Sequence, residues 1–366
     1  MHITVSRNNI LGAVQRCQNV VERRHTVPIL SNILLRASDD GLTASATDLE
    51  VGIRARVDAS VQEAGGTTVA ARKLFDVLKE LDADADVELK TEDGFLRIAS
   101  GRSRFKLATM APDDFPDVQE ESGGVAVRLD GADLAAMIAS TSFAMSTDET
   151  RKYLTGTLFE LDGDGRLNLV ATDGHRLALM RRALGQPVET CQSIVPRKAV
   201  VEIRKLCEDE PGQVELRIGE RQIGLNAGGC TLVSKLIDAR FPNYADVIPV
   251  NNPELATASR AELDQILRRI MIVANEFTHD VRLLLRPGEM VVSAHNTDQE
   301  QAEESLELDY AGPETEIGFN ARYIRDVLGV MKGDAVRIHF RDGLSPVLLD
   351  ESEDAAAQFV IMPMRI

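Results

Sequence analysis

The chain has 366 residues, 44% of them hydrophobic, and a formal net charge of -17, so it is long enough for two or three domains with substantial cores. Aromatic residues make up 4% and Trp is absent, which predicts aliphatic cores. No run of about 18 apolar residues occurs, which argues against a membrane span. The first residues lack the charged and apolar regions of a signal peptide, so a cytoplasmic protein is expected.

Motifs for nucleotide, metal and hydrolase chemistry are missing from the sequence. It contains no GxxxxGK[ST], HExxH or GxSxG motif. The four cysteines, Cys17, Cys191, Cys207 and Cys230, have no zinc-ligand spacing and are expected to be reduced structural thiols. The segment DGDG (162–165) is interpreted as a hairpin turn rather than a calcium loop. We therefore expect no catalytic residue, metal or cofactor.

Two sequence markers recur with a common period. Thr-Asp pairs stand at 47–48, 172–173 and 297–298, each 125 residues from the next. Arg72, Arg197 and Arg322 have the same spacing. Agreement between two markers indicates an ancient triplication. Looser composition at 117–124 and 249–254 predicts domains over residues 1–122, 123–251 and 252–366.

Each repeat shows the same pattern of predicted elements. Apolar residues at helical spacing, such as Ile10, Ala13, Val14 and Cys17, predict six helices, two in each repeat. The expected helices cover residues 6–21, 71–81, 131–146, 197–207, 260–274 and 321–332. Alternating segments such as GLTASAT (41–47) and frequent turn signals predict antiparallel strands between the helices. The fold class is therefore α+β: three similar domains, each with two helices packed on antiparallel sheets.

Charge is divided unevenly between the predicted helices and the rest of the chain. The helices carry 15 basic and 7 acidic residues, and the remainder carries 26 basic and 51 acidic residues. One interpretation is simply that helix surfaces attract charged residues. The alternative is a basic helical surface on an acidic protein, suited to phosphates without reading bases. Because helix propensity favours neither sign of charge, we prefer the second interpretation.

The whole chain resembles the beta subunit of bacterial DNA polymerase III, the sliding clamp family. The resemblance is carried by segments in all three repeats: TVPILSNILL (26–35), TDLE (47–50), VAARK (69–73), SGRSRF (100–105), ATDGHRLAL (171–179), VPRK (195–198), SKLIDARFPNY (234–244), IGFNARYIRDVL (317–328) and VIMPMRI (360–366). It implies the DNA clamp fold in a head-to-tail homodimeric ring, with helices lining the hole. The implied function is that of a non-catalytic processivity factor that encircles double-stranded DNA without sequence specificity.

The resemblance also implies three sets of functional residues. DNA contacts are expected at Arg24, Arg72, Lys152, Tyr153, Lys198 and Arg282. The dimer interface is expected to pair Arg102, Arg104, Phe105 and Leu107 with Ile272, Val273, Glu300, Glu303 and Glu304 of the other chain. A peptide-binding pocket is expected to use Leu154, Thr172, Gly174, His175, Arg176, Leu177, Pro242, Val247, Asn320, Tyr323, Leu344, Val360, Met362, Pro363, Met364 and Arg365.

The implied partners of that pocket are the replicative polymerase alpha subunit, the clamp loader complex, and other polymerases and repair proteins. Asp246 and Pro346 depart from the family pattern, which carries a basic residue and Ser there, and the loop around Phe277 also differs. These departures bear on peptide preference. Two other classes stay open on the residues alone. A catalytic DNA-processing enzyme would show divalent-ion-dependent turnover, and a scaffold protein that binds no nucleic acid would lack salt-sensitive retention on circular DNA.

Overall fold

The computed structural model describes every residue except 23–26, 117–119, 121–122, 211, 353–355 and 366. The chain forms two compact units, one of Met1–Ala135 with Lys198–Leu236 and the other of Ala136–Arg197 with Ile237–Ile366. Each unit is built on a single continuous antiparallel sheet. Arg24, a predicted DNA contact, lies outside the described residues.

The first unit contains a sheet of 13 strands covered by helices α1 (Arg7–Val20) and α2 (Ala71–Lys79). Its strands are β1 (His2–Ser6), β2 (Asn32–Ser38), β3 (Gly41–Thr47), β4 (Val51–Val57), β5 (Ser60–Glu63), β6 (Gly65–Ala70), β7 (Asp86–Glu92), β8 (Phe95–Ser100), β9 (Ser103–Met110), β10 (Val125–Asp130), β15 (Gln213–Ile218), β16 (Gln222–Ala227) and β17 (Cys230–Lys235). Their order is β10-β15-β16-β17-β4-β3-β2-β6-β9-β8-β7-β1-β5. Helix α4 (Arg197–Asp209) falls almost wholly in this unit.

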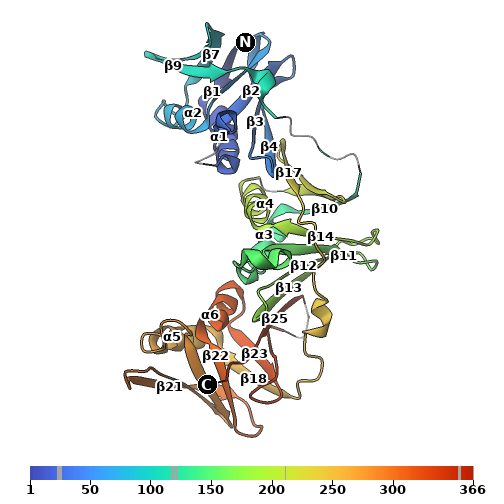
Figure 1. Cartoon of the computed structure of the whole chain (residues 1–366), viewed down its shortest axis with the longest axis vertical. Helices are drawn as coiled ribbons and strands as arrows, with labels where there is room; N and C mark the ends of the chain where they lie inside the picture. Colours follow the sequence, from blue (N-terminus) through green and yellow to red (C-terminus); the bar gives the residue numbers. More distant parts are fainter. Residues whose placement is uncertain (23–26, 117–119, 121–122, 211, 353–355, 366) are drawn as a thin grey trace. The chain divides into compact units, whose positions relative to one another are not determined.

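The second unit contains a sheet of 12 strands and helices α5 (Arg260–Ile270) and α6 (Ala321–Val330), which contact each other (Figure 1). Its strands are β11 (Gly156–Leu161), β12 (Arg166–Thr172), β13 (Arg176–Ala183), β14 (Cys191–Pro196), β18 (Glu254–Ser259), β19 (Asp280–Arg286), β20 (Glu289–His295), β21 (Gln301–Asp309), β22 (Thr315–Asn320), β23 (Ala335–Phe340), β24 (Val347–Asp350) and β25 (Ala357–Ile361). Their order is β14-β11-β12-β13-β25-β24-β23-β18-β21-β20-β19-β22. Helix α3 (Gly131–Ala139) begins in the first unit and ends in the second.

Strand pairs between neighbouring repeats explain why there are two units rather than three. In the first unit β17 pairs with β4, and in the second unit β25 pairs with β13. Moving β4 and β17 forward by 125 residues gives the segments that form β13 and β25, so the two pairings are equivalent. Hydrogen bonds thus fuse successive repeats into continuous sheets, and the compact units do not follow the boundaries predicted from composition.

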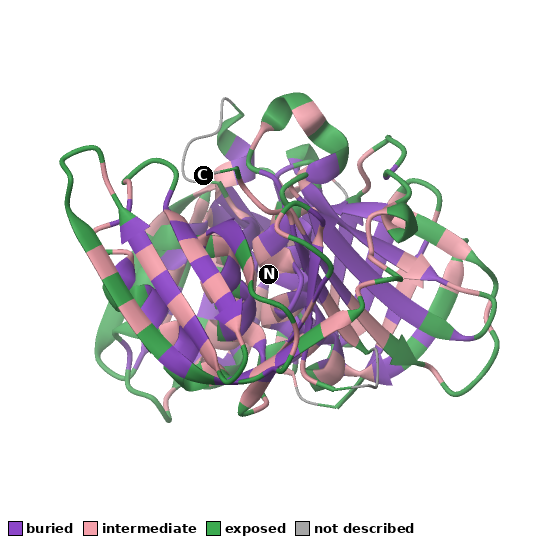
Figure 2. Ribbon diagram, turned by 90° about the horizontal axis from the view of Figure 1, so that it is seen from below, coloured by how far each residue is buried: buried purple, intermediate pink, exposed green. Residues whose placement is uncertain are grey.

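The predicted helices are present, but two of them end well before the predicted boundary. The helix predicted over 131–146 ends at Ala139, where the Thr141 hydroxyl donates to the Met137 carbonyl at 2.9 Å and competes with helical bonding. The helix predicted over 260–274 ends at Ile270. Several strands, such as β19, alternate between buried and more accessible residues (Figure 2), and DGDG joins β11 to β12 as the predicted hairpin turn.

Candidate functional site

A hollow of about 310 Å³ lies in the second unit, where β12, β13 and β25 meet the segment 242–247. Its lining is mainly apolar, with a few polar groups: Arg151, Tyr153, Leu154, Thr172, Gly174, Arg176, Leu177, Pro242, Asn243, Tyr244, Val247, Val360 and Met362. Leu154, Leu177 and Val360 also belong to a cluster of buried core residues, which forms the floor. A rigid apolar floor with a few polar groups suits a ligand with apolar anchors.

A tight turn between β12 and β13 shapes one edge of the hollow. The Asp173 carboxylate accepts from the backbone N–H groups of His175 (2.9 Å) and Arg176 (3.1 Å). Gly174 has a φ of 92°, which favours glycine, and a Cβ there would lie 3.1 Å from Nη1 of Arg151. A side chain at this position would therefore crowd the edge of the hollow.

The guanidinium of Arg176 is held on every side. It donates to Asp173 (3.1 Å), to Asp326 of α6 (2.5 Å) and to the Phe143 carbonyl (2.8 Å). Its Cζ also lies 4.5 Å from the centroid of the Tyr323 ring. Because each of its three nitrogens makes one of these hydrogen bonds, Arg176 forms a fixed wall rather than a free charge.

Tyr244 also lines the hollow. It lies in a short 3-10 helix (Tyr244–Asp246), and its hydroxyl donates to Oε2 of Glu160 at 2.5 Å. Burial, and then this hydrogen bond, raise the pKa of Tyr244. The hydrogen bond to Glu160 holds the ring in place.

The C-terminal segment closes the hollow beyond β25. The Met362 N–H donates to the His175 carbonyl at 2.9 Å, and the Met364 N–H donates to the Gly318 carbonyl at 2.8 Å. The side chain of Met362 lines the hollow, and methionine adapts to ligands of varied shape.

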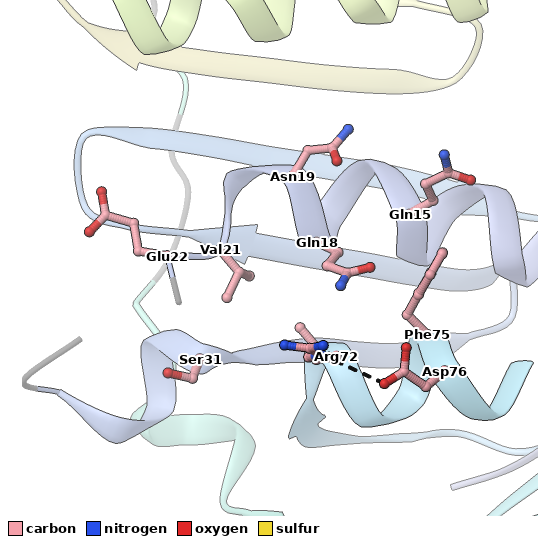
Figure 3. Close-up of a pocket in the computed structure, with 10 residues that line it drawn as sticks. Gln15, Gln18, Asn19, Val21, Glu22, Ser31, Arg72, Phe75 and Asp76 are labelled. Atoms are coloured by element: carbon pink, nitrogen blue, oxygen red, sulfur yellow. Dashed lines mark ion pairs between the residues drawn. The ribbon is translucent and has the colours of Figure 1, made fainter. Parts of the chain in front are cut away.

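A second hollow, of about 600 Å³, lies between α1 and α2 in the first unit (Figure 3). It is lined by Gln15, Gln18, Asn19, Val21, Glu22, Ser31, Ala71, Arg72, Phe75 and Asp76. Figure 3 shows Gln18 on the side of α1 that faces Arg72. The Arg72 side chain is largely exposed, with Nε 3.8 Å from an Asp76 carboxylate oxygen. This leaves most of its guanidinium open to a phosphate.

Most other helical cations are engaged inside the chain, so the count of basic residues overstates the free positive charge. Arg7 donates to the carbonyls of Leu78 (2.9 Å) and Lys79 (2.7 Å) at the end of α2. Arg260 caps α6 in the same way through the Leu328 carbonyl (3.2 Å). Arg16, Arg204, Lys205, Arg268, Arg269 and Arg325 pair with carboxylates. Most of the basic residues in the helices are therefore not free to contact DNA. Arg72, which is largely exposed, is a better candidate than these paired cations.

Besides the strands that end the two sheets, β9 and β21 each have an open edge over most of their length in a single chain. Among the described residues, positions 103–108 of β9 pair with β8 alone, and positions 301–307 of β21 pair with β20 alone. Phe105 is 37% exposed, and Ile272, which follows α5, is 82% exposed. Unpaired backbone beside exposed apolar side chains is typical of a strand that pairs with another chain.

Comparison with known proteins decides the family. Models of the N-terminal, central and C-terminal domains of the DNA polymerase III beta subunit match residues 1–119, 128–243 and 245–365.

This chain belongs to the DNA polymerase III beta subunit family.

The beta sliding clamp of Pseudomonas putida is 40% identical over 370 residues, and that of Escherichia coli K12 is 38% identical over 368 residues; both alignments cover 100% of each chain. The crystal structure of a DnaN sliding clamp from Pseudomonas aeruginosa bound to griselimycin superposes with a TM-score of 0.97 at 39% identity. The sliding clamp of Caulobacter crescentus superposes with a TM-score of 0.94 at 37% identity. Both structures are also matched over 100% of each chain.

The fold class predicted from the sequence is confirmed: this beta subunit has three clamp domains of mixed helix and antiparallel sheet. It is a non-catalytic processivity clamp of DNA replication. Like other beta subunits, it binds DNA, and it binds the polymerase and other proteins through a tethering site. The two alternatives left open by the residues, a catalytic enzyme and a scaffold that binds no nucleic acid, are thereby excluded.

The hollow of the second unit brings together nine of the residues expected in a peptide pocket of the beta subunit: Leu154, Thr172, Gly174, Arg176, Leu177, Pro242, Val247, Val360 and Met362. Seven others lie outside its lining: His175, Asn320, Tyr323, Leu344, Pro363, Met364 and Arg365. The His175 ring stacks on Tyr323 at 6.4 Å, and the Asn320 side chain caps α6. Leu344 is 66% exposed in the 341–345 segment.

Sequence reasoning missed Arg151, Asn243 and Tyr244 as pocket residues, and it assigned Tyr153 to DNA although Tyr153 lines this hollow. Asn243 and Tyr244 do belong to the SKLIDARFPNY segment that carried the family resemblance. The two departures from the family pattern lie outside the lining. Asp246 is exposed, and the Pro346 carbonyl accepts from Asn252 at 3.0 Å.

Phe277, in the loop that departs from the family pattern, is 91% exposed and does not line the hollow. Its N–H donates to the Asn275 side chain at 2.8 Å.

The structure treats the other expected DNA contacts differently. Lys152 is exposed, as a phosphate contact requires. Lys198 is already bonded to the Val20 carbonyl, Asp48 and Glu22, so it has no free donor. Arg282 is paired with Glu316 at 3.4 Å.

Arg282 also stands on the face of β19 opposite to the buried residues Val281, Leu283 and Leu285, and therefore away from the core-facing side of its sheet. Neither Lys198 nor Arg282 is therefore free to bind a phosphate as Arg72 is.

All four cysteines are free, and burial raises the pKa of each, to about 12 for Cys207. The described part of the chain contains no group of three His, Cys, Asp or Glu side chains placed to hold a metal ion. Within the same residues, no helix is both long enough and apolar enough to cross a membrane.

Proposed function

We propose that two copies of this beta subunit join head to tail in a closed ring around duplex DNA in the cytoplasm. The observation that carries this proposal is the pair of open strand edges on β9 and β21. Within the chain, β13 pairs with β25. The strand one 125-residue period after β13 is β21, and the strand two periods before β25 is β9. The same pairing in a ring therefore joins β21 of one chain to β9 of the other. The clamp domains of this ring are residues 1–122, 123–251 and 252–366.

The side chains beside these edges support the same seam. Arg102, just before β9, and Arg104, at its start, are exposed, and Phe105 and Leu107 follow in the strand. On the other side are Ile272, Val273, Glu300 and Glu303. Glu304 is engaged within its own chain: Arg269 donates to it at 2.6 Å and lowers the pKa of its carboxyl. We therefore assign ion pairing across the seam to Glu300 and Glu303 rather than to Glu304.

The repeat period adds one ion pair to this seam. Lys198 bonds to Asp48 inside the chain. Lys73 stands one 125-residue period before Lys198, and Asp298 stands two periods after Asp48. In a ring of two chains, Lys73 of one chain and Asp298 of the other are therefore the equivalent pair. Both are exposed, and neither side chain has a partner among the described residues. Two unpaired side chains of opposite charge can form an ion pair between two copies of the chain. We therefore assign Lys73 and Asp298 to the seam.

A charge exchange tests this assignment and the ring together. Lys73→Asp or Asp298→Lys alone should weaken the dimer by about tenfold or more, because each places like charges at both seams. The double variant should recover dimerisation and retention on nicked circular DNA, measured by sedimentation and gel filtration. Lys79→Asp, on the same helix but outside the proposed seam, is the control. Equal dimerisation of all variants would contradict the pairing.

The remaining surfaces take DNA and protein partners. We propose that Arg72 and Lys152, with Arg24, contact duplex DNA without sequence specificity. The hollow of the second unit binds extended peptides with apolar anchors from the replicative polymerase alpha subunit, the clamp loader complex, and other polymerases and repair proteins. Its mainly apolar lining and its buried floor support this role.

A further inference from the structure

The ammonium group of Lys198 joins three parts of the first unit. Lys198 is the second residue of α4. Its Nζ donates to the Val20 carbonyl at 2.9 Å and to Asp48, and it lies 3.4 Å from Glu22. An ammonium group has three donors, and here all three are directed at acceptors. The positive charge of Lys198 is therefore neutralised by groups of the protein itself.

The carbonyl that Lys198 reaches is at the end of a helix. Helix α1 ends at Val20, and its last turn contains no basic residue. Carbonyl groups in the last turn of a helix have no helical partner and carry partial negative charge. Lys198 supplies the missing cation from a position 178 residues away in sequence.

The carboxylate that Lys198 reaches is fixed in a turn. Asp48 is buried, and its Oδ1 accepts from the N–H groups of Glu50 (2.9 Å) and Val51 (2.7 Å). Its Oδ2 accepts a hydrogen bond from Nζ of Lys198. Val51 begins β4, the strand that pairs with β17 of the next repeat. Helix α4 and strand β17 are thus both fastened to the first repeat at this turn.

The next pair of repeats, in the second unit, contains a comparable arrangement around the equivalent turn carboxylate, with a cation that comes from a different position. Arg176 follows the equivalent turn and bonds to its carboxylate, Asp173. It also donates to the Phe143 carbonyl, just after α3, and to Asp326 of α6. The position equivalent to Lys198 is Tyr323, whose ring lies under the guanidinium. The recurrence of this arrangement with a different cation indicates a structural requirement.

We propose that Lys198 is a latch between the first two repeats and not a phosphate ligand. It fastens the start of α4 to the end of α1 and to the 47–51 turn. Arg176 performs the same task between the second and third repeats. These contacts help to hold successive repeats together where the sheet joins them through a single pair of strands, β4 with β17 and β13 with β25.

Hydrogen exchange of the full-length protein tests the latch directly and does not depend on DNA binding. Lys198→Met keeps the length of the side chain but removes its charge, so the amides of Glu50, Val51 and the last turn of α1 should exchange at least tenfold faster. Asp48→Asn can still accept from Glu50 and Val51 through Oδ1, yet it should speed exchange at the end of α1 equally. The double variant should be no worse than either single variant, because both remove one interaction.

The control is Lys205→Met, which breaks an ion pair with Glu202 (2.8 Å) on the same helix and should leave these amides unchanged. The salt dependence of DNA binding provides a second readout, since each phosphate that a cation of the protein neutralises on duplex DNA contributes about 0.9 to the slope. Lys198→Met should leave the slope unchanged. Unchanged hydrogen exchange, or a slope reduced by about 0.9 or more, would overturn the latch.

Discussion

Replacing Ile272 with Ala and Val273 with Arg should convert the 40.0 kDa chain from a dimer to a monomer in sedimentation experiments. Ile272 is exposed in the single chain, directly after α5, so its burial at the seam contributes about 1.5–3 kcal/mol. An Arg placed in an apolar contact adds a desolvation cost. Because the ring has two seams, about 3 kcal/mol lost at each raises the dimer dissociation constant roughly ten-thousandfold.

Val250 provides a matched control for this variant, because it is another highly exposed apolar residue and lies outside the proposed seam. Val250→Arg should leave the dimer intact. If the Ile272 and Val273 variant keeps the mass of the unmodified protein, the seam lies elsewhere.

Deleting Met362 to Ile366 should weaken peptide binding roughly a hundredfold while the protein stays dimeric. The deletion removes Met362 from the pocket lining, together with its bond to the His175 carbonyl. Loss of a few buried anchors costs about 3 kcal/mol in a typical interface, or roughly a hundredfold in affinity. Fluorescence polarisation with a labelled peptide carrying Gln-Leu and Leu-Phe pairs measures the loss, and sedimentation reports the dimer.

A second variant separates the pocket from the stability of the sheet. Val247 lines the hollow and is only partly buried, and it is not part of any strand, so Val247→Lys should weaken the peptide without loosening β25. Substitution of the exposed Leu344 by Ala, outside the observed lining, should have a smaller effect than Val247→Lys. Undiminished peptide binding by both the deletion and Val247→Lys would place the peptide site elsewhere.

Local periodicity predicted the helices well because burial follows it. Ile10, Ala13, Val14 and Cys17, expected on one face of the first helix, are all buried. The end of the third helix could not be predicted in this way, because the Thr141 hydroxyl competes for the helical carbonyl of Met137. The 125-residue period also predicted equivalent positions, since Arg72, Arg197 and Arg322 each lie in the first two residues of a helix.

Charge and pocket lining were less predictable because they depend on partners that are distant in sequence. Lys198 counts as a basic residue of a helix, but its ammonium group is paired with Asp48, which is 150 residues away in sequence. Tyr153 and Tyr244 line one hollow only because η4 (Glu149–Leu154) and the 242–247 segment are brought to the same strands. Nothing in the spacing of these residues indicates that meeting, and the family resemblance supplied the part of the pocket that was predicted.

The most direct test of the ring is whether the protein is linked to DNA topologically. Clamps loaded on nicked circular DNA should remain with the DNA in gel filtration, because a closed ring cannot leave a circle without opening. A single linearising cut should then release them, since the phosphate contacts proposed for Arg72 and Lys152 are too few to hold the protein on DNA by affinity alone. Release on linearisation is the result that the proposal predicts. Retention on the linear DNA, with its ends free of other proteins, would contradict encirclement.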